Sequence, residues 1–218
     1  MVNRPQKTEE KPRRGRPSLS EAALSERRAE IAAVAIQLFN EEGYASVSMR
    51  RLGKEVGLTP MALYRYFSNK LEILTALWDH VIGLAFEDVA AAGDGARDAQ
   101  DRLYRVSEAY VAYWFEHVEQ YQLVFMNADV SKADVTAFVS QDSIMKAYDV
   151  FFESIADVLG LTPAHPQVKT IGDGLICHLH GIMHSLITMQ GYPWTERDRL
   201  VKQAVDMVVA AGVSVERP

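Results

Sequence analysis

The chain has 218 residues, of which 48% are hydrophobic and 24% are charged, and these ordinary globular values exclude disorder of the whole chain. Its only cysteine, Cys177, excludes an intrachain disulfide and fits a reducing compartment. Met1 is followed by polar residues rather than by an apolar signal segment, and the longest apolar region, residues 175–189, is interrupted by histidines and too short to span a membrane. We therefore expect a soluble, cytoplasmic protein.

The net charge of −6 conceals an asymmetry along the chain. Residues 1–70 hold 13 basic against 8 acidic side chains, whereas residues 71–218 hold 10 against 21. A basic front on an acidic body indicates a protein that contacts DNA at one end only.

Residues 1–19 are rich in Lys, Arg and Pro, and this composition predicts a disordered basic arm. Within the arm, the segment 11–17 (Lys-Pro-Arg-Arg-Gly-Arg-Pro) is similar to the core of an AT-hook. Arg14 and Arg16 would fit the narrow, negative minor groove of A·T-rich DNA. A plain basic tail that adds only non-specific affinity explains the segment equally well.

Residues 20–68 are predicted to form a three-helix DNA-binding domain. A first helix runs over about 25–42, and two short helices follow it, joined by a tight turn at Gly57. Gly57 supplies a positive φ, Thr59 is a good N-cap, and Pro60 suits the first helical position because no N–H is needed there. This is the layout of a helix-turn-helix DNA reader.

Leu63 and Phe67 are expected to face the core of this domain. Their burial leaves the rest of the second short helix pointing outward, with two tyrosines and an arginine among the exposed side chains. Such a face suits phosphate and base-edge contact better than plain solvation. The predicted outward residues are Thr59, Met61, Ala62, Tyr64, Arg65 and Tyr66.

At these residues the chain resembles the TetR family of bacterial transcriptional regulators. The resemblance is carried by residues 63–72 (Leu-Tyr-Arg-Tyr-Phe-Ser-Asn-Lys-Leu-Glu) and by the run from Phe39 to Ser48. Residues 50–53, Arg-Arg-Leu-Gly, depart from the family's common Arg-Asp-Ile-Ala and place a glycine where an alanine usually packs.

The resemblance implies which residues touch DNA. Tyr64, Tyr66 and Lys70 would contact phosphates, with Lys70 at the start of the following helix. Thr59, Met61 and Ala62 would face base edges, the last two against a thymine methyl, and Ser48 would cap a helix and reach a phosphate. The complete predicted set is Arg14, Arg16, Ser48, Arg50, Thr59, Pro60, Met61, Ala62, Tyr64, Arg65, Tyr66 and Lys70.

Residues 69–218 are predicted to form a helical effector-binding and dimerisation domain. Its first helix, over about 69–92, is long enough to join the two domains as a lever, and Asn69 and Glu72 have capping-box spacing at its start. No alternating strand pattern or repeat is present, so the fold class is all-α with about nine helices. The later helices are expected over about 98–117, 119–128, 132–159, 167–190 and 195–211.

The body carries a second resemblance, to the TetR-type C-terminal domain marked by a Trp-His-Gly signature. It rests on residues 118–125 and on 178–182 (His-Leu-His-Gly-Ile), where Leu179 stands in place of the Trp. By family resemblance the last two helices form a homodimer interface, and we expect Val205 and Val208 to lie in it.

A set of aromatic and polar residues in the body could line a small-molecule pocket, although a helical core requires the same residue types. If Asp149 faced inward among them, it would indicate a cationic or hydrogen-bonding effector. The candidates are Tyr110, Tyr113, Trp114, His117, Tyr148, Asp149, Phe152, His180, Met183 and His184.

Cys177, His180 and His184 have the spacing of metal ligands on one helix. No acidic partner follows at a fixed offset, so structural or pocket-lining histidines are the preferred interpretation, and no metal or cofactor is predicted. The Gly-x-Gly pairs at 93–95 and 172–174 lack a preceding strand, and no catalytic motif is present. We therefore do not expect an enzyme.

Two hypotheses follow. The first is a homodimeric, ligand-responsive transcriptional repressor that binds a palindromic operator and releases it when an effector tilts the lever helix. The second is an all-α protein that binds a small molecule or a metal and carries a vestigial DNA-binding head.

Overall fold

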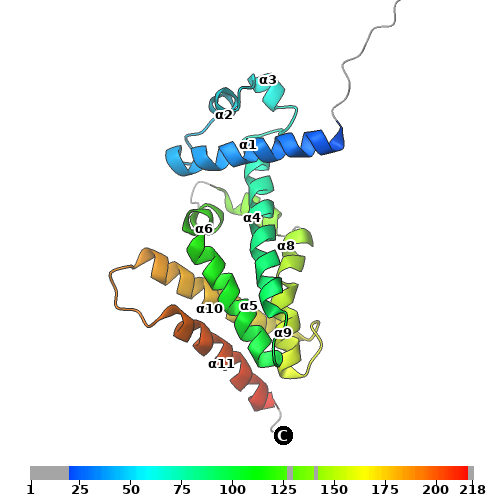
Figure 1. The fold of residues 1–218 in the computed structure, drawn as a ribbon, viewed down its shortest axis with the longest axis vertical. Coiled ribbons are helices and arrows are strands. Elements are labelled where there is room, and N and C mark those ends of the chain that lie inside the picture. Colours follow the sequence, from blue (N-terminus) through cyan, green and yellow to red (C-terminus); the bar gives the residue numbers. More distant parts are fainter. Residues whose placement is uncertain (1–19, 127–129, 140–141, 216–218) are drawn as a thin grey trace, which may run out of the picture.

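The computed structural model describes residues 20–126, 130–139 and 142–215, and within these ranges it contains helices and loops but no strand (Figure 1). The predicted all-α fold is confirmed. The head and lever comprise α1 (Glu21–Glu42), α2 (Met49–Glu55), α3 (Pro60–Leu63) and α4 (Lys70–Gly93). The body adds α5 (Ala99–Glu116), α6 (Val118–Phe125), α7 (Lys132–Val139), α8 (Asp142–Ala147), α9 (Asp149–Leu159), α10 (Pro166–Thr188) and α11 (Arg197–Val215).

Side-chain caps fix where the helices of the head begin. Ser20 accepts a hydrogen bond from the backbone N–H of Ala23, so α1 starts four residues earlier than its apolar stripe predicts. The side chains of Ser48, Thr59 and Asn69 cap α2, α3 and α4 in the same way.

The lever helix α4 runs from the head into the body, where it packs along α5 (Figure 1). Its inner face is apolar along most of its length, and Trp78 is buried with its indole Nε1 donating to the carbonyl of Leu123 at 3.3 Å. The helix is therefore held by both domains at once, as its length suggests. None of the described helices is long and apolar enough to span a membrane.

The single helix predicted over 132–159 is wrong, because the structure divides this stretch into α7, α8 and α9. Phe138 and Ile144 are both buried, but six residues of straight helix at about 100° per residue would place them on different faces. They lie on two separate helices, α7 and α8, and both face the core. At the boundary between α8 and α9 the backbone stays in the right-handed helical region, since Tyr148 has φ −77° and ψ −9°.

Helices α10 and α11 pack against each other at the side of the body away from α2 and α3 (Figure 1). The preceding helix α9 ends at Gly160, whose φ of 65° is the left-handed cap that the sequence indicates.

Candidate nucleic-acid interface and ligand cavity

The turn between α2 and α3 is built as the sequence predicts. Gly57 has φ 69°, and the Thr59 hydroxyl accepts from the backbone N–H of Ala62 at 3.2 Å. The backbone N–H of Leu58 donates to the carbonyl of Gly53 at 2.8 Å, and a Cβ on Gly53 would lie only 2.8 Å from the Leu58 oxygen. The glycine that departs from the family pattern is thus where the turn packs directly on the α2 backbone.

This turn presents the predicted reading residues at the end of the molecule farthest from α11 (Figure 1). Met61 is 77% exposed and Tyr64 is 50% exposed, while Leu63 and Phe67 are buried beneath them. Ala62 is half-buried. The other exposed residues of the predicted set are Ser48, Arg50, Thr59, Pro60 and Arg65.

Tyr66 is half-buried rather than fully outward, and its backbone carbonyl accepts from Arg28. The Arg28 guanidinium also lies 4.3 Å from the centre of the Phe67 ring and pairs with Glu72 at 2.9 Å. Tyr66 therefore belongs partly to the contact that joins α1 to α4.

Lys70 is half-buried at the start of α4. Its ammonium donates to the backbone carbonyl of Tyr44 and lies 4.1 Å from the centre of the Tyr44 ring. Lys70 thus ties α4 to the loop between α1 and α2, and its phosphate contact stays a prediction.

The N-terminus of α4 is capped differently from a simple capping box. Asn69 caps the helix by accepting from the backbone N–H of Glu72 at 2.8 Å, as predicted. The Glu72 carboxylate does not return to the Asn69 N–H, because it accepts from the N–H and hydroxyl of Ser68. Burial opposes ionisation of Glu72, but the hydrogen bonds from Ser68 and Arg28 outweigh it and lower the pKa of the carboxyl.

Little of the excess positive charge of residues 1–70 lies in the described part of the head. Residues 20–70 hold 7 basic against 6 acidic side chains, so most of the excess falls in the arm, where Arg14 and Arg16 lie outside the described residues. The Arg51 guanidinium forms ion pairs with Glu42 at 2.6 Å and with Glu55 at 2.5 Å, so it is not free to contact a phosphate.

Three exposed cations of the head make no ion pair with any residue that the structure describes: Arg50, Lys54 and Arg65. Lys54 was missed by sequence reasoning, which concentrated on the second short helix. Its place in the last turn of α2, next to the turn that leads to α3, was the available signal.

The body contains an inner cavity of about 450 Å³ between the lever and helices α6 to α10. Apolar and aromatic side chains form nearly all of its wall, and Lys169 and Asp173 are its charged members. The wall residues are Trp78, Ile82, Val124, Phe125, Val135, Phe138, Ile144, Met145, Tyr148, Phe152, Lys169, Asp173 and Ile176.

Only two of the predicted ligand residues line this cavity, Tyr148 and Phe152. Tyr110, Trp114 and Met183 are fully buried in the surrounding core. Tyr113 is buried and His117 half-buried, with their ring centres 4.5 Å apart, and neither lines the cavity.

Asp149 and His184 are exposed and do not line the inner cavity. The condition that Asp149 faces inward is not met, because the first turn of α9 presents this carboxylate to the surface. Sequence reasoning also missed most of the wall, including Trp78 and Phe138, since their direction depends on neighbouring helices.

A chain of hydrogen bonds runs behind the cavity. The hydroxyls of Tyr148 and Tyr110 are 3.2 Å apart, and the Tyr110 hydroxyl lies 3.0 Å from Nε2 of His180. Burial lowers the pKa of His180 to about 4, so the imidazole is neutral near neutral pH. Burial also raises the pKa of the Tyr110 phenol well above its usual value.

The arrangement of α10 separates the three residues with metal-ligand spacing. His180 packs among Tyr110, Tyr121 and Phe125, whereas Cys177 and His184 are exposed. Among the described residues, no group of three His, Cys, Asp or Glu side chains is placed to hold a metal ion.

Residues 31–77, which include the turn and its exposed helix, match the family model of the bacterial regulatory proteins of the tetR family. The DNA-binding segment is therefore of the TetR type. The function of the chain is that of a DNA-binding transcriptional regulator, and α1–α3 form its helix-turn-helix domain.

Curated relatives agree with this assignment. The transcriptional activator FasR of Mycolicibacterium smegmatis is 28% identical over 148 residues, which cover 67% of this chain and 67% of FasR. The nucleoid occlusion factor SlmA of Haemophilus influenzae is 28% identical over 44% of this chain and 45% of its own length. The repressor DrrR1 of Streptomyces coeruleorubidus is 41% identical over 61 residues, 28% of this chain and 22% of DrrR1.

Solved structures show the same fold over both domains. The fatty acid degradation regulator FadR of Bacillus halodurans has a TM-score of 0.67 at 14% identity and covers 84% of this chain and 94% of its own. A TetR-family regulator from Streptomyces coelicolor has a TM-score of 0.63 at 20% identity, over 88% of this chain and 82% of its own.

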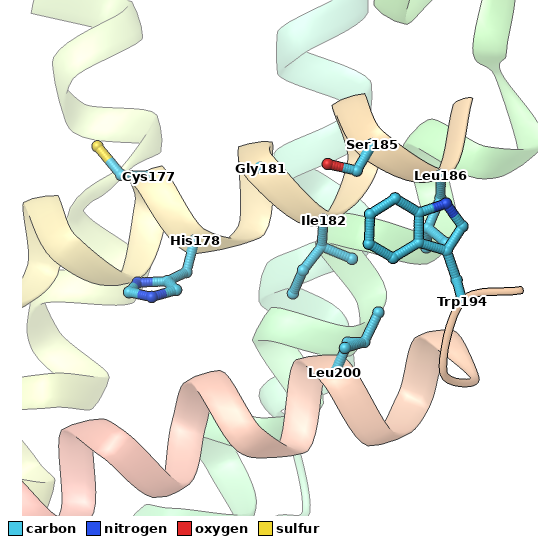
Figure 2. A pocket seen from close by; sticks show the side chains of 8 residues that line it. All are labelled: Cys177, His178, Gly181, Ile182, Ser185, Leu186, Trp194 and Leu200. Atoms are coloured by element: carbon cyan, nitrogen blue, oxygen red, sulfur yellow. The ribbon is translucent and has the colours of Figure 1, made fainter. Parts of the chain in front are cut away.

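The body also carries a groove of about 400 Å³ along α10 and α11. Figure 2 shows His178 and Ile182 pointing from α10 toward Leu200 of α11, with Trp194 at one end and Cys177 directed away. The remaining lining residues are Gly181, Ser185 and Leu186.

Val205 and Val208 do not belong to an exposed face. Val205 is 1% exposed and Val208 is 4% exposed, because they lie on the side of α11 that packs into the protomer. The expectation that they form the dimer contact is wrong.

Proposed function

We propose that this chain is a TetR-family regulator, a homodimeric, effector-responsive repressor that binds a palindromic operator. The observation that carries the proposal is the joining of an exposed DNA-reading surface to a ligand cavity through one helix, since α4 starts at the head and supplies Trp78 and Ile82 to the cavity wall. Operator binding places the protein in the cytoplasm.

In the proposed complex, Met61 and Ala62 face base edges in the major groove while Tyr64 and Lys70 contact phosphates. Arg50, Lys54 and Arg65 supply further phosphate contacts, because they are exposed and unpaired within the described part of the chain. Two such heads must lie about 34–36 Å apart to occupy successive major grooves.

A second copy of the chain is proposed to cover the outer faces of α10 and α11. On α11, Leu200, Gln203 and Met207 follow one another at helical spacing and are exposed or half-exposed, with Met207 44% exposed. On α10 the exposed positions include Gly174 and Gly181, whose small size permits close helix approach.

The Trp-His-Gly-type classification of the body is part of this proposal. His180 faces the aromatic core and Gly181 lines the groove, so the two residues of the signature present in this chain point to the ligand domain and to the dimer face. Leu179, at the Trp position, is fully buried.

The position of the cavity explains how an effector would release the protein from its operator. A molecule between α4 and α8–α9 contacts the lever directly, and it shifts the head only if it binds one lever orientation more tightly than the other. The spacing of the two heads then changes, and operator affinity falls.

The test is a mobility-shift titration of the full-length protein on its own upstream DNA, together with sedimentation. We expect a sequence-specific shift by a dimer, which Met207→Glu abolishes while halving the mass. Leu84→Glu, an equally exposed (44%) apolar position on α4, is the matched control and should change neither. No specific shift at low salt would instead support a ligand-binding protein with a vestigial head.

A further inference from the structure

Two cavities of the body share part of their wall, and the three residues that line both are called the doorway. Beside the inner cavity lies an outer groove of about 420 Å³, between α8–α9 and the start of α10. Met145, Phe152 and Lys169 line both spaces. The other residues of the outer groove are Lys146, Asp149, Glu153, Pro163 and Ala164.

The two spaces differ in polarity. The inner cavity is apolar and aromatic except for Lys169 and Asp173, whereas the outer groove carries charges along its length. A molecule that occupies both spaces therefore has an apolar body and one polar end, because a polar group deep in the cavity would find few partners.

Lys169 is the charged residue common to both spaces. Its ammonium donates to the two Asp173 oxygens at 2.6 and 2.5 Å and retains a third N–H for another acceptor. The acids of the outer groove have favourable neighbours of their own: Glu153 lies 3.6 Å from Arg102, which also pairs with Asp157 at 3.1 Å, and Asp149 sits in the first turn of α9. Lys146 makes no ion pair with any residue that the structure describes.

We infer that the effector is an elongated amphiphile with an anionic end group such as a carboxylate, its apolar body in the inner cavity and its charged end at Lys169 in the doorway. The inference rests on the proposed function only in treating the bound molecule as an effector. The binding site itself is independent of DNA.

Phe152 forms the aromatic side of the doorway and packs directly on the backbone of α10. A Cβ on Gly172 would lie 2.4 Å from the Phe152 ring, so Gly172→Ala forces the ring out of its position. Gly83→Ala on α4 is the matched control, because a Cβ there meets nothing within 4 Å.

The experiment is calorimetric titration of the full-length, DNA-free protein with three probes of one chain length, kept below micelle-forming concentrations: decanoate, decanol and decyltrimethylammonium. We expect one decanoate per chain, bound about tenfold more tightly than decyltrimethylammonium. Gly172→Ala should weaken binding of decanoate and decanol alike, whereas Gly83→Ala should change neither.

The charge at the doorway is tested by Lys169→Gln, which should weaken decanoate about three- to tenfold and leave decanol unchanged. Lys202→Gln is the control, since its ammonium pairs with Asp206 on α11 in the same i,i+4 geometry and with the same 62% side-chain exposure. It should change neither affinity.

Absence of decanoate binding, equal or tighter binding of the ammonium probe, or equal effects of the two lysine variants would overturn the inference. These outcomes decide it even if Gly172→Ala fails to fold. Because no DNA is present, a failure of operator binding is seen separately and refutes the proposed function alone.

Discussion

The head and the body use the same residue types in opposite ways. Met61 in α3 is 77% exposed, whereas Met183 in α10 is fully buried. Tyr64 is 50% exposed, whereas Tyr110 is fully buried and hydrogen-bonded to Tyr148 and His180. Residue type therefore indicates function only where local structure already fixes the direction of the side chain.

In the head that direction is fixed by short-range signals. The caps Ser48 and Thr59, the positive φ of Gly57 and the buried pair Leu63 and Phe67 leave few orientations for the residues between them. In the body, long helices carry apolar residues around much of their circumference, so the neighbouring helices decide which residues line a cavity. Substitutions in the two regions should therefore differ in their effects on stability and on DNA binding.

Val205→Asp should destabilise the protomer by about 3–5 kcal/mol, because it buries a carboxylate on the inner side of α11. Thermal unfolding and soluble yield measure the loss. Met207→Asp, two residues away on the outer side of the helix, should lower the unfolding transition only by the dimer contact that it removes, and by much less than Val205→Asp. If both variants unfold alike, the described orientation of α11 is wrong.

The free energy of unfolding should fall by up to about 3 kcal/mol as the pH drops from about 6.5 to about 4, owing to His180 alone. The unfolded chain takes up the proton in this window, while burial keeps the folded imidazole neutral. Urea unfolding across this range checks the slope. His180→Gln should flatten it, and His80→Gln, at an exposed position on α4, should not.

Gly53→Ala should destabilise the head by about 1–3 kcal/mol and weaken operator binding, because the new Cβ would press on the Leu58 carbonyl at 2.8 Å. Gly83→Ala meets no neighbour and should stabilise its helix by up to about 1 kcal/mol. Chemical unfolding and mobility shifts measure both variants. Equal stability of the two would show that the turn has room for an alanine.

Tyr64→Ala should change the free energy of unfolding by less than about 0.5 kcal/mol while weakening operator binding severalfold. The side chain is half-exposed on a surface that lies outside the buried core of the head. Calorimetric unfolding and mobility shifts on one preparation separate the two effects. A loss of stability as large as the loss of binding would place Tyr64 in the core and remove the contrast with Tyr110.

Local signals in the sequence account for the all-α class, the beginnings and ends of most helices, and the turn that presents Met61 and Tyr64. These features depend on interactions between residues a few positions apart, such as the Asn69 cap on Glu72 and the left-handed Gly160. The family model over residues 31–77 agrees, because it covers the region where local signals are densest.

The positions of the side chains in the body depend on tertiary packing. It divided residues 132–159 into three helices, turned Asp149 and His184 outward, and buried Val205 and Val208 within the protomer. A helical stripe shows that a face is covered without showing whether a neighbouring helix, a ligand or a second chain covers it. That choice depends on packing between residues far apart in the sequence, and it fixed which side of α11 remains for a partner.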